Sequence, residues 1–251
     1  MQHAMSFVWI NIMLKKLVSL IAKTFMHPQW LVFRDEARVR EKAVVLAKGH
    51  VLDIGCADQS LKPMLSEECS YTGLDYPGTV NSMYGTRPMI FGDAQTLPVK
   101  SASMDTIILL EVLEHVPDID AVISEALRVL KQDGLFLFSM PFLYPVHDSP
   151  FDFQRLTIHG LYRMMDRHSF EIVEEQVFGS PIETAGLLAN LAMTKTVLNS
   201  MKKKSPVFLL GLLLPLFIPT VNIFATILGK IAPADEFMPT GYMLVLRKKT
   251  E

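Results

Sequence analysis

The alternation of apolar and helical segments constrains this chain more than any other sequence feature. Six short apolar runs lie at residues 50–55, 71–76, 88–93, 104–111, 134–141 and 170–178, with helical patterns between several of them, and a seventh closes the chain as "TGYMLVLRKK". Strands that alternate with helices predict βαβ units and a largely parallel sheet. With 251 residues, half of them hydrophobic, the chain can bury the core of one α/β domain with additions.

Several stretches between and before these runs are expected to be helices. Residues 120–134 carry apolar side chains at helical spacing, and we expect this helix to stop at Gly134, a good C-terminal cap. Residues 35–48 and 183–204 predict two more helices, the second ending in three lysines. Residues 7–25 predict an amphipathic helix that either packs on the core or lies in a membrane interface.

The longest apolar stretch, residues 207–231, would form a helix long enough to span a bilayer. Pro215 and Pro219 favour two short helices or a shallow hairpin over one straight span. If the closing strand joins the main sheet, both ends of the run lie on one side of any membrane, which forbids a single crossing. We expect association with a membrane surface, where Lys202, Lys203 and Lys204 meet anionic lipid. Alternatively, residues 207–231 form buried helices that cover the sheet or a substrate pocket, an oligomer interface, or a transmembrane helix.

Charge and cysteine usage exclude some classes of protein. The net charge of −2 gives no general attraction to nucleic acid. The two cysteines, Cys56 and Cys69, lack the spacing of a zinc site, and no metal site is indicated elsewhere. Lys15 and Lys16 follow the first apolar residues without a cleavage site, so a secretory signal is poorly supported. We expect a cytoplasmic protein, held peripherally on the cytoplasmic face of the membrane.

The segment "VLDIGCADQS", residues 51–60, has the pattern of a strand that enters a tight turn. A dinucleotide fingerprint would place glycines at 55, 57 and 60, but the chain has Gly55, Ala57 and Ser60. No Lys or Arg lies between residues 51 and 61, so pyrophosphate binding is disfavoured. Asp53 and Asp58 would repel a polyphosphate but suit a ligand that carries a sulfonium and an ammonium group.

Acidic residues stand at the ends of three consecutive predicted strands, as Asp53, Asp75 and Asp93. Each alone is typical of a helix cap or a turn. Together they lie at the carboxyl edge of the sheet, where open α/β folds bind ligands. Asp75 can accept both hydroxyls of a ribose, and Asp93 can face an adenine.

In these segments the sequence resembles the class I S-adenosylmethionine-dependent methyltransferases, and in particular the type 11 domain. The matching pieces are "VLDIGCA", "YTGLD", "FGDAQTLPVKSASMDTIILLEVLEHV", "EALRVLKQDGLFLFSMP" and "GYMLVLRKK", which cover about residues 40–180 and the last strand. The resemblance implies an α/β fold with a Rossmann-like, seven-stranded, mostly parallel sheet whose last strand is antiparallel. It also implies S-adenosyl-L-methionine as cofactor, bound at Asp53, Gly55, Cys56, Ala57, Asp75, Tyr76, Asp93, Ala94 and Glu111.

The turn departs from this family at Ala57 and Gln59, where glycine is more usual. An alanine costs little there if its φ is negative, so the cofactor affinity would be reduced without being lost. The expected domains are an N-terminal helical extension (1–48), the methyltransferase core (49–180), a hydrophobic helical insertion (181–235) and the last strand of the core sheet (236–251).

Residues 140–157 follow the fifth strand and are similar to a segment of methyltransferase-like proteins associated with cell-surface polysaccharide or lipid-linked sugar synthesis. His147 is the candidate general base, because its ordinary pKa lies near working pH. The alternative is a loop histidine bonded to Asp148 or Asp152. We expect Asp152 and Arg155 to form a local ion pair, while His115 is either structural or supports the site.

Two functions are consistent with these patterns. The first is methyl transfer from S-adenosylmethionine to a small-molecule, lipid-linked or glycan acceptor at a membrane surface. The second is a catalytically silent methyltransferase-like protein that acts as a membrane-associated binding or assembly partner. The altered turn favours the second function, and the acidic series favours the first. The sequence leaves the oligomeric state open.

Overall fold

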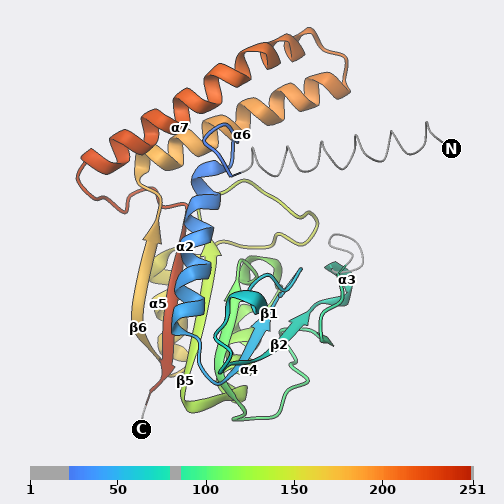
Figure 1. Ribbon diagram of the computed structural model, residues 1–251, viewed down its shortest axis with the longest axis vertical. Coiled ribbons are helices and arrows are strands. Elements are labelled where there is room, and N and C mark those ends of the chain that lie inside the picture. Colours follow the sequence, from blue (N-terminus) through green and yellow to red (C-terminus); the bar gives the residue numbers. More distant parts are fainter. Residues whose placement is uncertain (1–22, 80–85, 250–251) are drawn as a thin grey trace, which may run out of the picture. The chain divides into compact units, whose positions relative to one another are not determined.

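The computed structural model describes residues 23–79 and 86–249, which fall into two compact units (Figure 1). Among the described residues, the larger unit joins Arg38–Phe178 to residues 240–249. The smaller unit joins residues 23–37 to Gly179–Pro239. The amphipathic helix predicted for residues 7–25 lies, except for its last three residues, outside the described residues.

The larger unit is built on a seven-stranded sheet in the order β3-β2-β1-β4-β5-β7-β6. The strands are β1 (His50–Ile54), β2 (Ser70–Asp75), β3 (Ile90–Phe91), β4 (Met104–Leu110), β5 (Leu130–Pro141), β6 (Phe170–Phe178) and β7 (Gly241–Lys248). β7 lies between β5 and β6 and is antiparallel to both, whereas the other neighbouring pairs are parallel. The structure thus confirms the predicted α/β fold, including the antiparallel last strand.

The register of β1 sets the position of the functional edge. Ile54, the last residue of β1, pairs with Leu74 on β2 and with Leu109 on β4. These three side chains are buried, as expected for parallel strands covered on both faces. The segments that follow β1, β2 and β4 therefore leave the sheet at the same edge.

Helices cover both faces of this sheet. On one face, α4 (Ile119–Val129) and α5 (Ile158–Arg167) bury Val122, Ile123 and Leu161 against the largest core cluster. On the other, Val39 and Ala43 of α2 (Trp30–Leu46) pack with Val51, Ile108 and Leu137. Three short helices, η1 (Lys62–Met64), α3 (Pro77–Thr79) and η3 (Leu113–His115), lie in the connections.

The prediction that Gly134 ends the fourth helix is wrong. α4 ends at Val129, and β5 begins at Leu130, which pairs with Met104. The fully buried side chain of Leu130 takes the space beside Gly134, where an added Cβ would lie 2.6 Å from Leu130 Cδ1. The glycine is thus explained by close packing within β5 and not by a helix cap.

The smaller unit contains a helical hairpin formed by α6 (Pro181–Lys202) and α7 (Leu214–Ile231), joined through η4 (Pro206–Leu213) and lying side by side in Figure 1. The backbones approach closely at Gly186, where an added Cβ would lie 3.1 Å from Ala225 Cβ. Nearby, Asn190 Nδ2 donates to Asn222 Oδ1 at 2.9 Å, and both side chains are fully buried. This polar pair fixes the hairpin register, because each partner would otherwise lose a buried hydrogen bond.

The prediction that both prolines break the hydrophobic run is wrong for Pro219. Pro215 lies at the start of α7, where a missing N–H costs nothing, but Pro219 lies inside the helix. The helix continues past it because Ile218, Asn222 and Ala225 are buried on the same side and offset one lost hydrogen bond. The hairpin therefore forms between α6 and the run, and not within the run.

Candidate functional site

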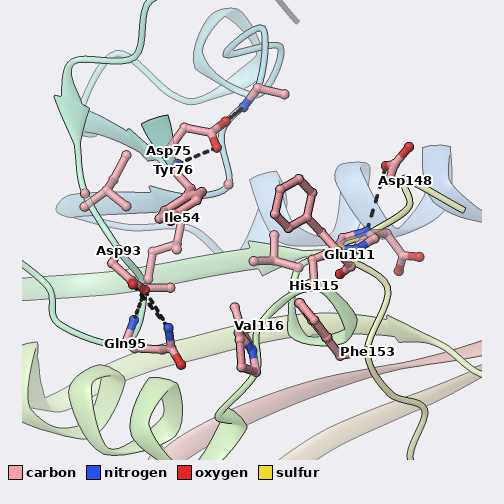
Figure 2. A pocket seen from close by; sticks show the side chains of 18 residues that line it. Ile54, Asp75, Tyr76, Asp93, Gln95, Glu111, His115, Val116, Asp148 and Phe153 are labelled. Atoms are coloured by element: carbon pink, nitrogen blue, oxygen red, sulfur yellow. Dashed lines mark hydrogen bonds and ion pairs between the residues drawn. The ribbon is translucent and has the colours of Figure 1, made fainter. Parts of the chain in front are cut away.

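A cavity of about 240 Å³ lies at the carboxyl edge of the sheet (Figure 2). Seven of the nine residues predicted to bind the cofactor line it: Gly55, Ala57, Asp75, Tyr76, Asp93, Ala94 and Glu111. Figure 2 shows Asp75 and Asp93 on one side of the cavity, and Glu111, His115 and Asp148 on the other. Asp53 and Cys56 are buried beside the turn and do not contribute to the lining.

The turn after β1 adopts three left-handed backbone conformations. The φ angles are +75° at Gly55, +43° at Ala57 and +57° at Gln59. A negative φ at Ala57, the condition for a cheap replacement of glycine, is therefore not met. Each non-glycine residue in this region costs roughly 1–2 kcal/mol. The turn thus keeps a backbone conformation suited to glycine, and the strain at Ala57 and Gln59 lowers the free energy of unfolding of the protein.

Asp75 holds this turn in place. Its Oδ2 accepts a hydrogen bond from the Ala57 backbone N–H at 2.8 Å, and its Oδ1 accepts one from the Tyr76 N–H at 2.7 Å. A carboxylate oxygen can accept more than one hydrogen bond, and Asp75 lines the cavity. The same residue thus orders the loop and presents acceptors at the edge of the cavity.

Asp53 lies beneath the turn, where the Tyr71 hydroxyl donates to its Oδ2 at 2.7 Å. Burial raises the pKa of Asp53 to about 6, although the hydrogen bond from Tyr71 acts in the opposite direction. Burial, and then the charge of Asp53, raise the pKa of the Cys56 thiol to about 12. Cys56 is therefore a neutral thiol that packs below the turn.

The lining of the cavity fits S-adenosylmethionine. Its carboxylates are Asp75, Asp93, Glu111 and Asp148, it includes His115, and none of its described residues is Lys or Arg. Apolar side chains such as Ile54, Leu74 and Val116 complete the wall. A lining with this charge suits a sulfonium and an ammonium group and disfavours a polyphosphate.

On the other side of the cavity, Glu111 and η3 bring two carboxylates and a histidine together. Glu111 has a φ of +55°, and its Oε1 accepts from the Ser139 hydroxyl at 2.6 Å. Glu114 is fully buried, and burial, followed by the charge of Glu111, raises its pKa well above the usual range. The His115 ring lies 3.0 Å from the Phe151 carbonyl through Nδ1, and burial lowers its pKa.

His147, the predicted base, does not line the cavity, whereas His115 does. The two rings contact edge to face with centroids 4.8 Å apart. His147 Nδ1 lies 3.4 Å from Asp152 Oδ2, and its Nε2 lies 3.9 Å from Glu114 Oε1. The ion pair expected between Asp152 and Arg155 is confirmed. Sequence reasoning missed Glu114, although "LEHV" placed it beside His115 just after a strand.

Comparisons with known proteins identify methyltransferases as the relatives of this chain. Residues 52–138 match the family model described as a methyltransferase domain. A probable S-adenosylmethionine-dependent methyltransferase from Mycolicibacterium smegmatis is 29% identical over 150 residues, which are 55% of this chain and 58% of that protein. The ubiquinone/menaquinone biosynthesis C-methyltransferase UbiE from Caulobacter sp. is 31% identical over 117 residues, 43% of this chain and 46% of that protein.

Among solved structures, a SAM-dependent methyltransferase from Archaeoglobus fulgidus has the same fold, with a TM-score of 0.53, 16% identity, and coverage of 92% of this chain and 99% of that one. The chain therefore contains a methyltransferase domain of the class I S-adenosylmethionine-dependent kind. S-adenosyl-L-methionine is the cofactor that this family implies. The chain spans about half the length of the curated relatives it matches.

The left-handed turn predicts that Ala57→Gly stabilises the protein. Glycine adopts a φ of +43° without steric strain, so we expect the free energy of unfolding to rise by about 0.5–1 kcal/mol after the larger backbone entropy of glycine is subtracted. Urea denaturation measures the change. The matched control, Ala121→Gly in α4, should destabilise by about 1 kcal/mol. Destabilisation by both variants would contradict the strained turn.

Burial of Asp53 predicts a pH-dependent stability. Its pKa in the folded state, about 6, exceeds the unfolded value of about 3.9. The contribution of Asp53 to the free energy of unfolding is thus greatest below pH ~4 and is lost as the pH rises through about 6, by up to about 3 kcal/mol. Asp53→Asn can still accept from Tyr71 and should be more stable than the parent at pH 7 but not at pH ~3.5. Urea denaturation at both values tests this, and an equal difference at both would refute it.

Proposed function

We propose that the chain binds S-adenosylmethionine in this cavity and transfers its methyl group to an acceptor. The observation that carries the proposal is the set of carboxylates at one edge of the sheet, in a lining with no described Lys or Arg. Methyltransferase activity is the function named for the relatives, and here it is inferred for this chain.

Each side of the cavity has a part in this proposal. The cofactor supplies a methyl group on a positively charged sulfur. Asp75 would accept the ribose hydroxyls, Asp93 with Ala94 would border the adenine, and the turn at Gly55 would approach the methionine part. Glu111 faces the other side of the cavity and would lie near the sulfonium (Figure 2). Fixing both reactants in line is the main source of rate for such a transfer.

The acceptor would enter beside residues 140–157. This loop places Asp148, Phe151 and Phe153 on the cavity wall, and Phe153 is half exposed. A partly exposed aromatic side chain offers a surface for a sugar ring or an acyl chain. We propose a lipid-linked or glycan acceptor, with His147 as the predicted base, although of the two histidines His115 is the one that lines the cavity.

The hydrophobic run supports a peripheral contact with the cytoplasmic face of a membrane. Pro206–Ile231 is long and apolar enough to cross a bilayer by length and composition, and 11% of its most apolar window is buried. Its exposed large side chains include Leu209, Leu212, Leu213, Leu216, Phe224 and Ile231. The insertion leaves β6 at Phe178 and returns at Gly241, and these two residues pair. A sheet on one side of the membrane therefore permits surface insertion and excludes a single crossing.

A catalytically silent methyltransferase-like protein that acts as a membrane-associated binding or assembly partner remains the second candidate function. The observation that favours it is the strain at Ala57 and Gln59. Against it, Asp75 still binds the Ala57 N–H, so the turn keeps a binding geometry. The binding experiment below separates the two candidates.

Substitution of Asp75 tests the cofactor site. We expect Asp75→Ala to weaken S-adenosylhomocysteine binding by about 10–100-fold, because it removes the ribose acceptor and loosens the turn. The control Glu67→Ala, at an exposed position before β2 and outside the cavity lining, should leave the affinity unchanged. Calorimetry on purified protein measures both. If the parent protein does not bind S-adenosylhomocysteine at millimolar concentration, the proposed enzyme function is refuted. If Asp75→Ala binds with the same affinity as the parent, the assignment of Asp75 to the ribose is refuted.

Charged substitutions test the membrane contact. Leu212 and Leu216 are 81% and 74% exposed, so Leu212→Glu with Leu216→Glu should fold and should lose most co-sedimentation with vesicles that contain anionic lipid. Val45→Glu, at a position 79% exposed on α2, is the matched control and should bind as the parent does. If the double variant binds vesicles as the parent does, the membrane contact does not lie on η4 and α7.

A further inference from the structure

Three side chains next to the cavity come from segments far apart in the sequence and converge through their polar atoms. Glu114 and His115 lie on η3, and His147 lies on the loop after β5. Glu114 Oε1 lies 3.6 Å from His115 Nε2 and 3.9 Å from His147 Nε2. One ligand atom from each residue lies within 4.8 Å of the other two.

The hydrogen bonds of both imidazoles leave Nε2 as an acceptor. His115 Nδ1 faces the Phe151 carbonyl at 3.0 Å, and a carbonyl can only accept, so Nδ1 carries the proton. His147 Nδ1 lies 3.3 Å from the Pro145 carbonyl and 3.4 Å from Asp152 Oδ2, both acceptors. Arg155 Nη2 also lies 3.4 Å from this atom, but its guanidinium is paired with Asp152. The two Nε2 lone pairs are therefore available on the side of Glu114.

The carboxylate between them has no donor of its own. Glu114 is fully buried, and neither oxygen has a hydrogen-bond partner among the described residues. A buried carboxylate without a partner is costly, and two facing imidazole lone pairs add repulsion. Three acceptors that converge in this way form a coordination site for a cation, and the alternative is a protonated Glu114 that donates to one of the imidazoles.

From this geometry we propose that Glu114, His115 and His147 bind one divalent first-row transition-metal ion. An ion about 2.1 Å from each ligand would hold the ligand atoms about 3.0–3.4 Å apart. The observed 3.6 and 3.9 Å therefore need to shorten by up to about 0.9 Å, and the two imidazole nitrogens, which lie within 4.8 Å of each other, need to close to the same spacing when the ion binds. Two imidazoles and one carboxylate suit Mn²⁺ to Zn²⁺ better than Mg²⁺, which prefers oxygen ligands. The Nδ1–H contacts to carbonyl and carboxylate oxygens are the usual outer support of such ligands.

The site is accessible and lies against the methyl-transfer cavity. The side chains of His115 and His147 are 17% and 27% exposed, and His115 lines the cavity. With three protein ligands, the ion keeps coordination positions open for water or for an acceptor oxygen. Resting on the proposed function, this role makes the acceptor an oxygen-bearing one, a hydroxyl or phenol, and makes His147 a ligand in place of the predicted base.

Metal binding is tested on the untagged full chain, freed of metal with a chelator. Titration with Co²⁺, followed by visible absorption and calorimetry, should show one site from which Zn²⁺ displaces Co²⁺. Glu114→Gln should weaken Co²⁺ binding by at least about 100-fold, and the metal-free variant should be at least as stable as the metal-free parent, because a neutral amide replaces the buried carboxylate. The control His168→Gln removes the imidazole beside Asp120 and should bind Co²⁺ like the parent.

Absence of Co²⁺ binding, or equal binding by Glu114→Gln, would overturn the metal site and leave a hydrogen-bonded cluster. Calorimetry with S-adenosylhomocysteine on the same sample keeps the two proposals apart. If the protein binds S-adenosylhomocysteine but does not bind Co²⁺, the metal site is refuted and the proposed methyltransferase function is unaffected. If the protein binds Co²⁺ but does not bind S-adenosylhomocysteine, the metal site is supported and a role of the metal ion in methyl transfer is refuted.

Discussion

The parallel pairing of β1 with both β2 and β4 is the constraint on which the rest of the site depends. It aligns Ile54 with Leu74 and Leu109, so the segments after these strands meet at one edge. Asp75 then binds the backbone of the turn that follows β1, and Glu111 begins the segment after β4. One register thus brings together a turn, a carboxylate and a second acidic segment that are spread over more than 50 residues of the sequence.

Features that depend on local pattern were predictable from the sequence. All seven strands were expected from short apolar runs, and the antiparallel direction of the last strand followed from the family resemblance. The acidic residues at strand ends could be placed at one edge because parallel strands share their carboxyl edge. Two local predictions failed where tertiary packing decides. Leu130 fills the space beside Gly134, and α6 supports α7 across Pro219.

Features that depend on contacts between distant segments were not predictable. The sequence shows glycine missing at Ala57 and Gln59, but only the folded turn shows that both residues have a positive φ. Glu114 reads as one more polar residue after a strand, and its burial arises where η3 meets the loop that carries His147. Because that loop follows about 30 residues later, no spacing rule indicated the three-residue cluster.

A crystal structure of the full chain with S-adenosylhomocysteine tests the central claim most directly. The account predicts the ligand in the cavity of Figure 2, with its ribose hydroxyls at Asp75, its adenine beside Asp93 and Ala94, and its sulfur toward Glu111. A cavity that stays without ligand at saturating concentration, or a ligand bound at another place on the chain, would contradict it.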